Sequence, residues 1–461
     1  MPIVGGFIVP HPPLIVHEVG KGQERKIHKT IEAYEEIGRR IKKLKPDIIV
    51  MSTPHSVMYS NYLHISPGQF SEGSFRDFGA PHAHYEVSYC TEFIQKLSDL
   101  SKSEGIPAGT LGEKKKQLDH GVLVPLSFIK KEYQNFKFVR VSISGLSLLT
   151  HYKFGKLIAS ISNQMDQRVV FVASGDLSHK LLEEGPYGFS EDGPLFDQRI
   201  TQALSTGDFY DLLNFEDRFC ESAGECGLRS FIILSGVLDG LIVRSELLSY
   251  EGPFGVGYAV ASYEPIGYDD SRKFDERYEE VEKERLSSIR INEDPYVRLA
   301  RLSLEHYIKK GVELAKPNNI LGEMLETKAG VFVSLKKDGM LRGCIGTTAA
   351  TTKSVADEII QNAISAGLRD PRFDPVKEDE LSQIIYSVDV LTPSKPIANI
   401  NDLDPKKFGV IVRSHGKSGL LLPDLEGIDS PEKQVEIALR KAGISENEKY
   451  SLERFEVIRH H

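Results

Sequence analysis

Short apolar runs that alternate with longer amphipathic stretches are the feature that most limits how the first 265 residues of this 461-residue chain can fold. The runs are rich in β-branched residues, which is typical of strands buried on both faces of a sheet. They lie at residues 3–9, 47–52, 136–143 and 168–173. Helical spacing separates them, as at 23–44 and 92–103. The alternation predicts a mostly parallel sheet covered by helices, which is a three-layer α/β/α domain.

The composition changes abruptly after two further strand-like runs, 241–249 and 255–263. Most residues from 269 to 290 are charged, which predicts a solvated helix or linker. Beyond it, helix and hairpin signals are mixed without regular β–α–β alternation, which predicts a smaller α+β domain. The predicted organisation is a first domain at 1–265, a charged linker at 266–290 and a second domain at 291–461.

Charge and cysteine content narrow the class of protein. The net charge is −9, whereas nucleic-acid binders usually show a basic balance or a basic stripe, so this class of protein is disfavoured. Four cysteines in so long a chain form no disulfide framework, which is typical of a reducing compartment. The apolar start has no positive leader, and no apolar run has bilayer-spanning length. We expect a cytoplasmic protein that binds neither nucleic acid nor membranes; the sequence leaves its oligomeric state open, and a homo-oligomer is compatible with it.

Histidines follow several of the predicted strands. His11 (VPHPPL), His55 (TPHSV) and His179 (ASGDLSH) each come just beyond a strand, and His120 (LDHGVLVPL) begins a helix-like segment. Ligands bind at the carboxyl ends of strands in open α/β sheets, so these side chains can meet in one crevice. A single loop histidine is more often solvated or a cap, but prolines around His11 favour a rigid metal ligand. The shared placement predicts a metal site.

The residue that completes this site is left open by the sequence. Two neutral imidazoles and one carboxylate suit non-haem Fe(II), and Glu225 in SAGECGLRS is the candidate carboxylate. Its alternative role is to stabilise a helix N-terminus. Cys226 is a rival ligand, whose thiolate would favour copper or zinc. Asp176 either orients His179 or caps the next helix.

The four histidine motifs, in this order, resemble the class III extradiol ring-cleavage dioxygenases (the LigB-like family) and the related Memo-like proteins over roughly residues 1–265. The resemblance implies three metal ligands, His11, His55 and Glu225. It implies that His179 is the acid/base residue and that His120 contacts substrate or bound oxygen. The implied activity is Fe(II)-dependent oxidation of a dihydroxy-aromatic or related small molecule. His82 and His84, in a turn-rich stretch, are expected to line the pocket or the surface and not to bind metal.

The second domain contains LRGCIGT, RDPRFDP and YSVDVLTPSKPI, which resemble the AMMECR-like domain over roughly residues 290–461. Cys344 lies near Arg342 and between two glycines, where a cation and open backbone favour a reactive thiolate. The alternative is a structural cysteine beside glycines that form a tight turn. His415 is a candidate partner for Cys344. No phosphate loop, dinucleotide fingerprint or zinc motif is present in the sequence.

The two domains on one chain resemble a fusion of the smaller members of the AmmeMemoRadiSam system, where they accompany a radical SAM protein. Two functions therefore stay open: an Fe(II)-dependent oxidoreductase, or a non-catalytic Memo-like metal-binding protein that works with a radical SAM partner. Ligation by Glu225 favours the first, and ligation by Cys226 favours the second. A nucleic-acid role for the second domain is disfavoured by the acidic charge.

Overall fold

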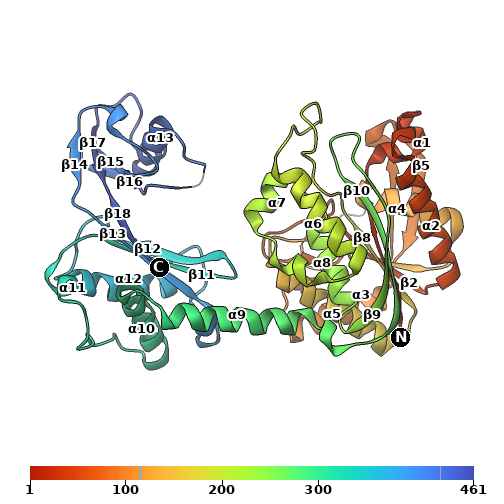
Figure 1. Ribbon diagram of the computed structural model, residues 1–461, viewed down its shortest axis with the longest axis horizontal. Helices are drawn as coiled ribbons and strands as arrows, with labels where there is room; N and C mark the ends of the chain where they lie inside the picture. Colours follow the sequence, from red (N-terminus) through yellow and green to blue (C-terminus); the bar gives the residue numbers. More distant parts are fainter. Residues whose placement is uncertain (113, 115–116, 426) are drawn as a thin grey trace. The chain divides into compact units, whose positions relative to one another are not determined.

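The computed structural model describes residues 1–112, 114, 117–425 and 427–461. These residues form two compact units, 1–280 and 281–461, which are described separately below (Figure 1). Within the described ranges, no helix combines the length and the apolar character needed to cross a membrane.

A six-stranded sheet forms the centre of the first unit (Figure 1). In spatial order its strands are β7 (Lys137–Ser142), β2 (Ile48–Thr53), β8 (Val169–Ser174), β1 (Ile3–Val9), β10 (Tyr258–Tyr268) and β9 (Leu241–Glu251). The first four strands run parallel, and β10 and β9 pair antiparallel at one edge. Each predicted apolar run forms one of these strands. The prediction of a mixed α/β fold with a largely parallel sheet is confirmed.

Helices pack against this sheet. Strands β2 and β8 are buried at every residue, which explains why their sequences begin as unbroken apolar runs and do not alternate. Helix α2 (His28–Leu44) packs against α4 (His120–Glu132) and contacts β1, β9 and β10. Helix α5 (Leu148–Met165) packs against α8 (Leu228–Val237), and both contact β1.

The remaining elements of this unit are smaller. Its other α-helices are α1 (His17–Gly20), α3 (Thr91–Ser103), α6 (Asp192–Thr206) and α7 (Asp217–Ala223). Two short sheets pair β3 (Leu63–His64) with β6 (Ala108–Gly109) and β4 (Phe70–Phe75) with β5 (Ala80–Ser88). The charged segment predicted as a solvated helix or linker forms most of helix α9 (Phe274–Ile291), and the boundary between the two units falls within it.

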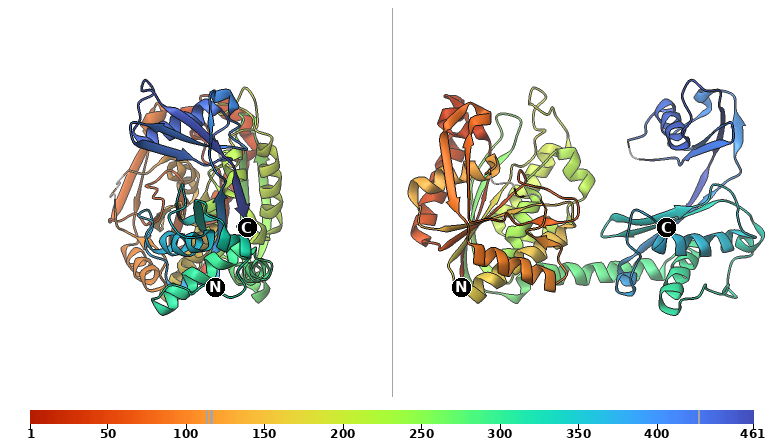
Figure 2. Two further views of the ribbon diagram at one scale, coloured as in Figure 1. Left: turned by 90° about the vertical axis from the view of Figure 1, so that its left-hand side faces the viewer. Right: turned by 180° about the vertical axis from the view of Figure 1, so that it is seen from behind.

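The second unit is rich in strands (Figure 2, right). One four-stranded sheet has the order β12 (Met340–Gly346), β11 (Val331–Lys337), β13 (Ile385–Leu391) and β18 (Val457–His460). The other has the order β14 (Lys395–Ile397), β17 (Ser451–Phe455), β15 (Gly409–Ser414) and β16 (Lys417–Leu421). The α-helices are α10 (Pro295–Lys310), α11 (Gly322–Glu326), α12 (Val355–Leu368) and α13 (Pro431–Ala442). Asp338 and Gly339 form the turn between β11 and β12, with positive φ at both residues, 51° and 77°.

Glycines allow the backbones of α5 and α8 to approach closely. A Cβ atom added at Gly155 would overlap the backbone carbonyl oxygen of Ile233, and one added at Gly236 would overlap that of Tyr152. Neither obstacle is a flexible side chain, so the helices themselves would have to separate.

We therefore expect Gly155→Ala to lower the free energy of unfolding by about 1–3 kcal/mol, because overpacking displaces a close-packed interface. Urea denaturation followed by circular dichroism measures this change. Gly267→Ala is the control, since the three atoms nearest its added Cβ all belong to the side chain of Ile242, and the closest of them is the flexible tip at 3.3 Å. Equal stability of the two variants would contradict the packing argument.

Candidate metal centre

Three adjacent strands deliver the predicted histidines to one end of the sheet. Strand β8 lies between β1 and β2 and runs parallel to both. His11 comes just after β1, His55 just after β2 and His179 shortly after β8. His120 is the first residue of α4. The carboxyl ends of these strands therefore bring together residues that are far apart in sequence.

His11 has an unprotonated nitrogen directed at this cluster. The Ser174 hydroxyl donates to the carbonyl of Gly121 at 2.6 Å, so its oxygen accepts from Nδ1 of His11 at 3.0 Å. With its proton on Nδ1, His11 keeps the lone pair of Nε2 free for a ligand. Nε2 of His55 lies 2.9 Å from Nε2 of His11. Two nitrogens about 2.1 Å from one ion are about 3 Å apart when they meet it at a right angle, so this pair fits metal binding.

The third donor near these nitrogens is a thiol. Sγ of Cys226 lies 3.7 Å from Nε2 of His11. Ligand atoms of His11, His55 and Cys226 all lie within 4.8 Å of one another, and so do those of Asp176, His179 and Cys226. The thiol is common to both groups. The residues present therefore form a candidate site with nitrogen, sulfur and oxygen donors.

Glu225 does not join either group. Its carboxylate accepts the backbone N–H of Leu228 at 2.7 Å, at the start of α8, and burial raises its pKa. This is the helix-terminus role that the sequence offered as the alternative. The predicted ligand set of His11, His55 and Glu225 is thus not the one that the structure assembles, because the α8 backbone engages the carboxylate and its neighbour Cys226 faces the histidines.

Burial keeps the histidines of the cluster neutral. Desolvation, with repulsion from His55, His120 and His179, holds the pKa of His11 well below its usual value. Desolvation also lowers the pKa of His120, and it lowers the pKa of both His55 and His179 to about 4. Neutral imidazoles are the form that binds metal ions and that accepts protons.

Hydrogen bonds fix the turns that carry these rings. The Thr53 hydroxyl donates to Asp119 at 2.7 Å and accepts the N–H of His55 at 3.2 Å, which ties the end of β2 to the start of α4. As a result the rings of His55 and His120 lie with their centroids 4.0 Å apart.

Asp176 does not cap the following helix, which was one of the two roles expected from the sequence. Its carboxylate accepts the backbone N–H of His11 at 2.7 Å, and burial raises its pKa to about 7. The next helix, α6, begins only at Asp192, so Asp176 does not cap it. Asp176 therefore fixes the turn that carries His11.

The small polar residues around the histidines were not singled out from the sequence. Thr53 and Asp119 each lie within two residues of a histidine. They could have been found in the sequence as a hydroxyl and a carboxylate close to His55 and His120. Ser174 is far from His11 in sequence, and only the pairing of Val9 with Ser174 brings the two together.

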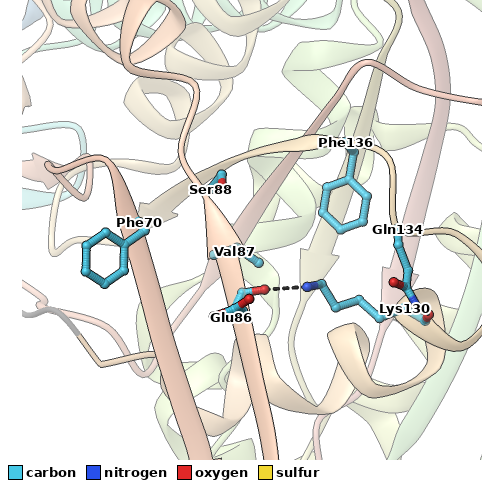
Figure 3. A pocket seen from close by; sticks show the side chains of 7 residues that line it. All are labelled: Phe70, Glu86, Val87, Ser88, Lys130, Gln134 and Phe136. Carbon is cyan, nitrogen blue, oxygen red and sulfur yellow. Dashed lines mark hydrogen bonds between the residues drawn. The ribbon is translucent and has the colours of Figure 1, made fainter.

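His82 and His84 lie on strand β5 with exposed side chains, and His84 faces Glu72 at 3.5 Å. They belong to the surface, one of the two places expected. A separate hollow at the other end of α4 from His120 is lined by Phe70, Glu86, Val87, Ser88, Lys130, Gln134 and Phe136 (Figure 3). There the Lys130 ammonium donates to the carbonyl of Glu86. No group of metal donors lies there among the residues that the structure describes.

The predicted residues of the second unit are engaged in structural contacts. Arg342 binds Glu380 through two nitrogens at 3.0 Å, and a third nitrogen donates to the carbonyl of Asp374. Cys344 accepts a hydrogen bond from Ser334 at 3.2 Å and donates its N–H to Asp370 at 2.9 Å. Arg342 thus braces the RDPRFDP loop. His415 lies in the turn between β15 and β16, in the other sheet.

Comparison with known families agrees with this architecture. A family model described as the catalytic LigB subunit of aromatic ring-opening dioxygenase matches residues 5–261, and one described as AMMECR1 matches residues 297–460. The chain belongs to the LigB family. Its LigB domain is fused to an AMMECR1 domain, as the sequence motifs predicted.

Similar proteins match all or part of this chain. A protein of Clostridium acetobutylicum is 43% identical over 468 residues, covering 100% of this chain and 99% of its own length. A Thermotoga maritima protein is 46% identical over 172 residues, covering 37% of this chain and 99% of its own length. The crystal structure of an uncharacterized protein from Pyrococcus horikoshii is 32% identical, with a TM-score of 0.33, and covers 36% of this chain and 88% of that one.

The geometry predicts which substitution disturbs metal binding. Cys226→Ser should weaken Co(II) binding and remove the near-ultraviolet thiolate-to-cobalt absorption, because it removes the sulfur donor. Glu225→Gln should leave both unchanged, since its carboxylate binds α8 instead. Titration of Co(II) into the full chain, followed by absorption spectroscopy, measures the difference. The opposite result, with Co(II) binding lost in Glu225→Gln and kept in Cys226→Ser, would show that Glu225 and not Cys226 binds the metal with the two histidines.

Proposed function

We propose that the LigB domain is an oxidoreductase of the extradiol dioxygenase type that uses Fe(II) to oxidise a dihydroxy-aromatic or related small molecule. One observation carries the proposal. Nε2 of His179 is buried and has no hydrogen-bond partner among the described residues, although it lies in the group that contains Asp176 and Cys226. A buried polar atom without a partner is costly unless a ligand or reacting group meets it.

The donor atoms present suit a metal ion. His11 and His55 offer neutral imidazole nitrogens, and Cys226 offers a thiol that metal binding would deprotonate. Bound iron would supply a Lewis acid for the hydroxyl oxygens of the substrate and electrons for dioxygen.

His179 is the proposed acid/base residue. Because its pKa is lowered to about 4, the ring is neutral near pH 7 and can take a proton from a substrate hydroxyl at Nε2. His120, whose ring packs on His55, is proposed to contact the substrate. Asp176 and Ser174 keep His11 in place through the hydrogen bonds described above.

A second candidate function is favoured by Cys226. Thiolate donors favour copper or zinc over oxygen-activating iron, so the same site suits a non-catalytic Memo-like metal-binding protein. In that role the chain would serve a radical SAM partner. The metal present in protein purified from its own host, and its oxygen chemistry, separate the two candidates.

For either function we propose the same cellular compartment and the same domain architecture. Cys90, Cys220, Cys226 and Cys344 are all free thiols, which suits a reducing cytoplasm. We propose that helix pairs α2–α4 and α5–α8 form the outer layers of a three-layer domain. The proposed partners are a small-molecule substrate and, in the second function, the radical SAM protein.

Oxygen uptake by the chain reconstituted with Fe(II) under anaerobic conditions tests the first function on a panel of catechols. We expect His179→Ala to lower the rate about 100-fold or more while metal content is unchanged, because general acid/base catalysis is lost. His82→Ala, on the exposed strand β5, is the control and should keep full activity. No uptake by the unaltered chain with any catechol, despite tight metal binding, would leave only the second function.

A further inference from the structure

Two exposed aromatic side chains lie beside the histidine cluster. Phe78 is 40% exposed, and its ring centroid is 5.4 Å from that of His120. Tyr187 is 60% exposed, and its ring centroid is 5.0 Å from that of His179. An aromatic ring stabilises a protein or a complex most when its surface is removed from water. Two such rings are left exposed beside one polar site, which suggests that a bound ligand covers them.

Phe78 is held in place by its neighbours. It ends a short 3-10 helix, Arg76–Phe78, at the tip of the β4–β5 hairpin, and Gly79 turns the chain back with φ of 80°. The ring of Phe75 is fully buried and lies 6.3 Å from that of Phe78. The hairpin tip is therefore anchored in the core while Phe78 is left beside His120.

The loop that carries Tyr187 is also braced. A bridge between Leu181 and Phe189 closes it, and the N–H of Leu181 donates to the carbonyl of Gly255 at 3.0 Å. Gly255 passes so close to Gly185 that an added Cβ would lie 3.0 Å from the Cα of Gly185. The position of Tyr187 beside His179 is thus set by packing.

Other exposed apolar side chains belong to the same segments. Met58, three residues after His55, is 58% exposed, and Leu182 and Phe189, in the loop of Tyr187, are 42% and 44% exposed. The segments around the polar site therefore carry apolar side chains. A ligand with polar atoms at one end and a flat apolar body matches both parts.

We propose that Phe78 and Tyr187 determine substrate selection by contacting a planar aromatic ring whose adjacent hydroxyl oxygens reach the His11–His55–Cys226 donors. Relative to its neighbouring histidine, Phe78 is nearly perpendicular, at 71°, and Tyr187 is tilted by 34°. Aromatic rings pair favourably in edge-to-face and offset-stacked arrangements, so rings at either of these angles can contact a flat substrate. This inference rests on the proposed function, because it places the substrate at the same donors.

The chain has no tryptophan, which allows a site-specific test. Phe78→Trp and Tyr187→Trp each introduce the single indole of the protein at the proposed contact. The full chain is loaded with Zn(II), which supports chelation without turnover, and titrated with catechol. We expect saturable quenching of the indole fluorescence. Tyr268→Trp, at a residue 72% exposed on β10, is the control and should show only quenching that rises linearly with concentration.

Calorimetric titration of the Zn(II)-loaded chain tests the role of the rings. Phe78→Ala and Tyr187→Ala should each weaken catechol binding about 10-fold. Their binding of cyclohexane-1,2-diol, which has adjacent hydroxyls but no flat ring, should be unchanged and weaker than that of catechol. Tyr268→Ala should bind both as the unaltered chain does, and zinc content and circular dichroism verify that each variant is folded.

The outcomes separate this inference from the proposed function. Catechol binding that depends on both rings, without oxygen uptake by the Fe(II)-loaded chain, supports the aromatic contact and contradicts the dioxygenase. Oxygen uptake with catechol affinity unchanged in both Ala variants contradicts the aromatic contact and supports the dioxygenase. Absence of catechol binding, or equal affinity for catechol and the diol, also overturns the inference.

Discussion

The parallel pairing of β8 with both β1 and β2 is the interaction on which the candidate site depends. Its register places Val9 opposite Ser174 and Ser52 opposite Ala173, so the three strands end at the same level. His11 and His55 then emerge on either side of β8 with their nitrogens 2.9 Å apart. A shift of one residue would turn every side chain of a strand to the opposite face and separate the donors.

Assembling these residues inside the protein costs solvation free energy, and the fold offsets only part of it. The histidines remain uncharged, and Ser174 and Asp176 satisfy polar atoms of His11. The direct contacts among the imidazole nitrogens and the nearby thiol contribute little stabilising free energy. A bound metal ion is the partner that makes such a cluster favourable, since it replaces several weak contacts by ligand bonds.

The sequence was sufficient for the strands and the histidines because both depend on local patterns. Continuous apolar runs identified the buried strands, and the histidines follow those strands directly. The choice between Glu225 and Cys226 depends on how an irregular loop meets α8, which no periodicity encodes. Phe78 and Tyr187 carry no motif, and their relation to His120 and His179 arises from tertiary packing alone. In the second unit, the motif LRGCIG located Arg342 and Cys344, but their partners Glu380 and Asp370 come from distant segments.

X-ray absorption spectroscopy at the zinc edge of the Zn(II)-loaded full chain tests the central claim most directly. The structure predicts one sulfur donor at about 2.3 Å from the ion and two imidazole nitrogens at about 2.0–2.1 Å. The sulfur contribution should vanish in Cys226→Ser. A first coordination shell of nitrogen and oxygen atoms alone in the unaltered chain would contradict the His11–His55–Cys226 site.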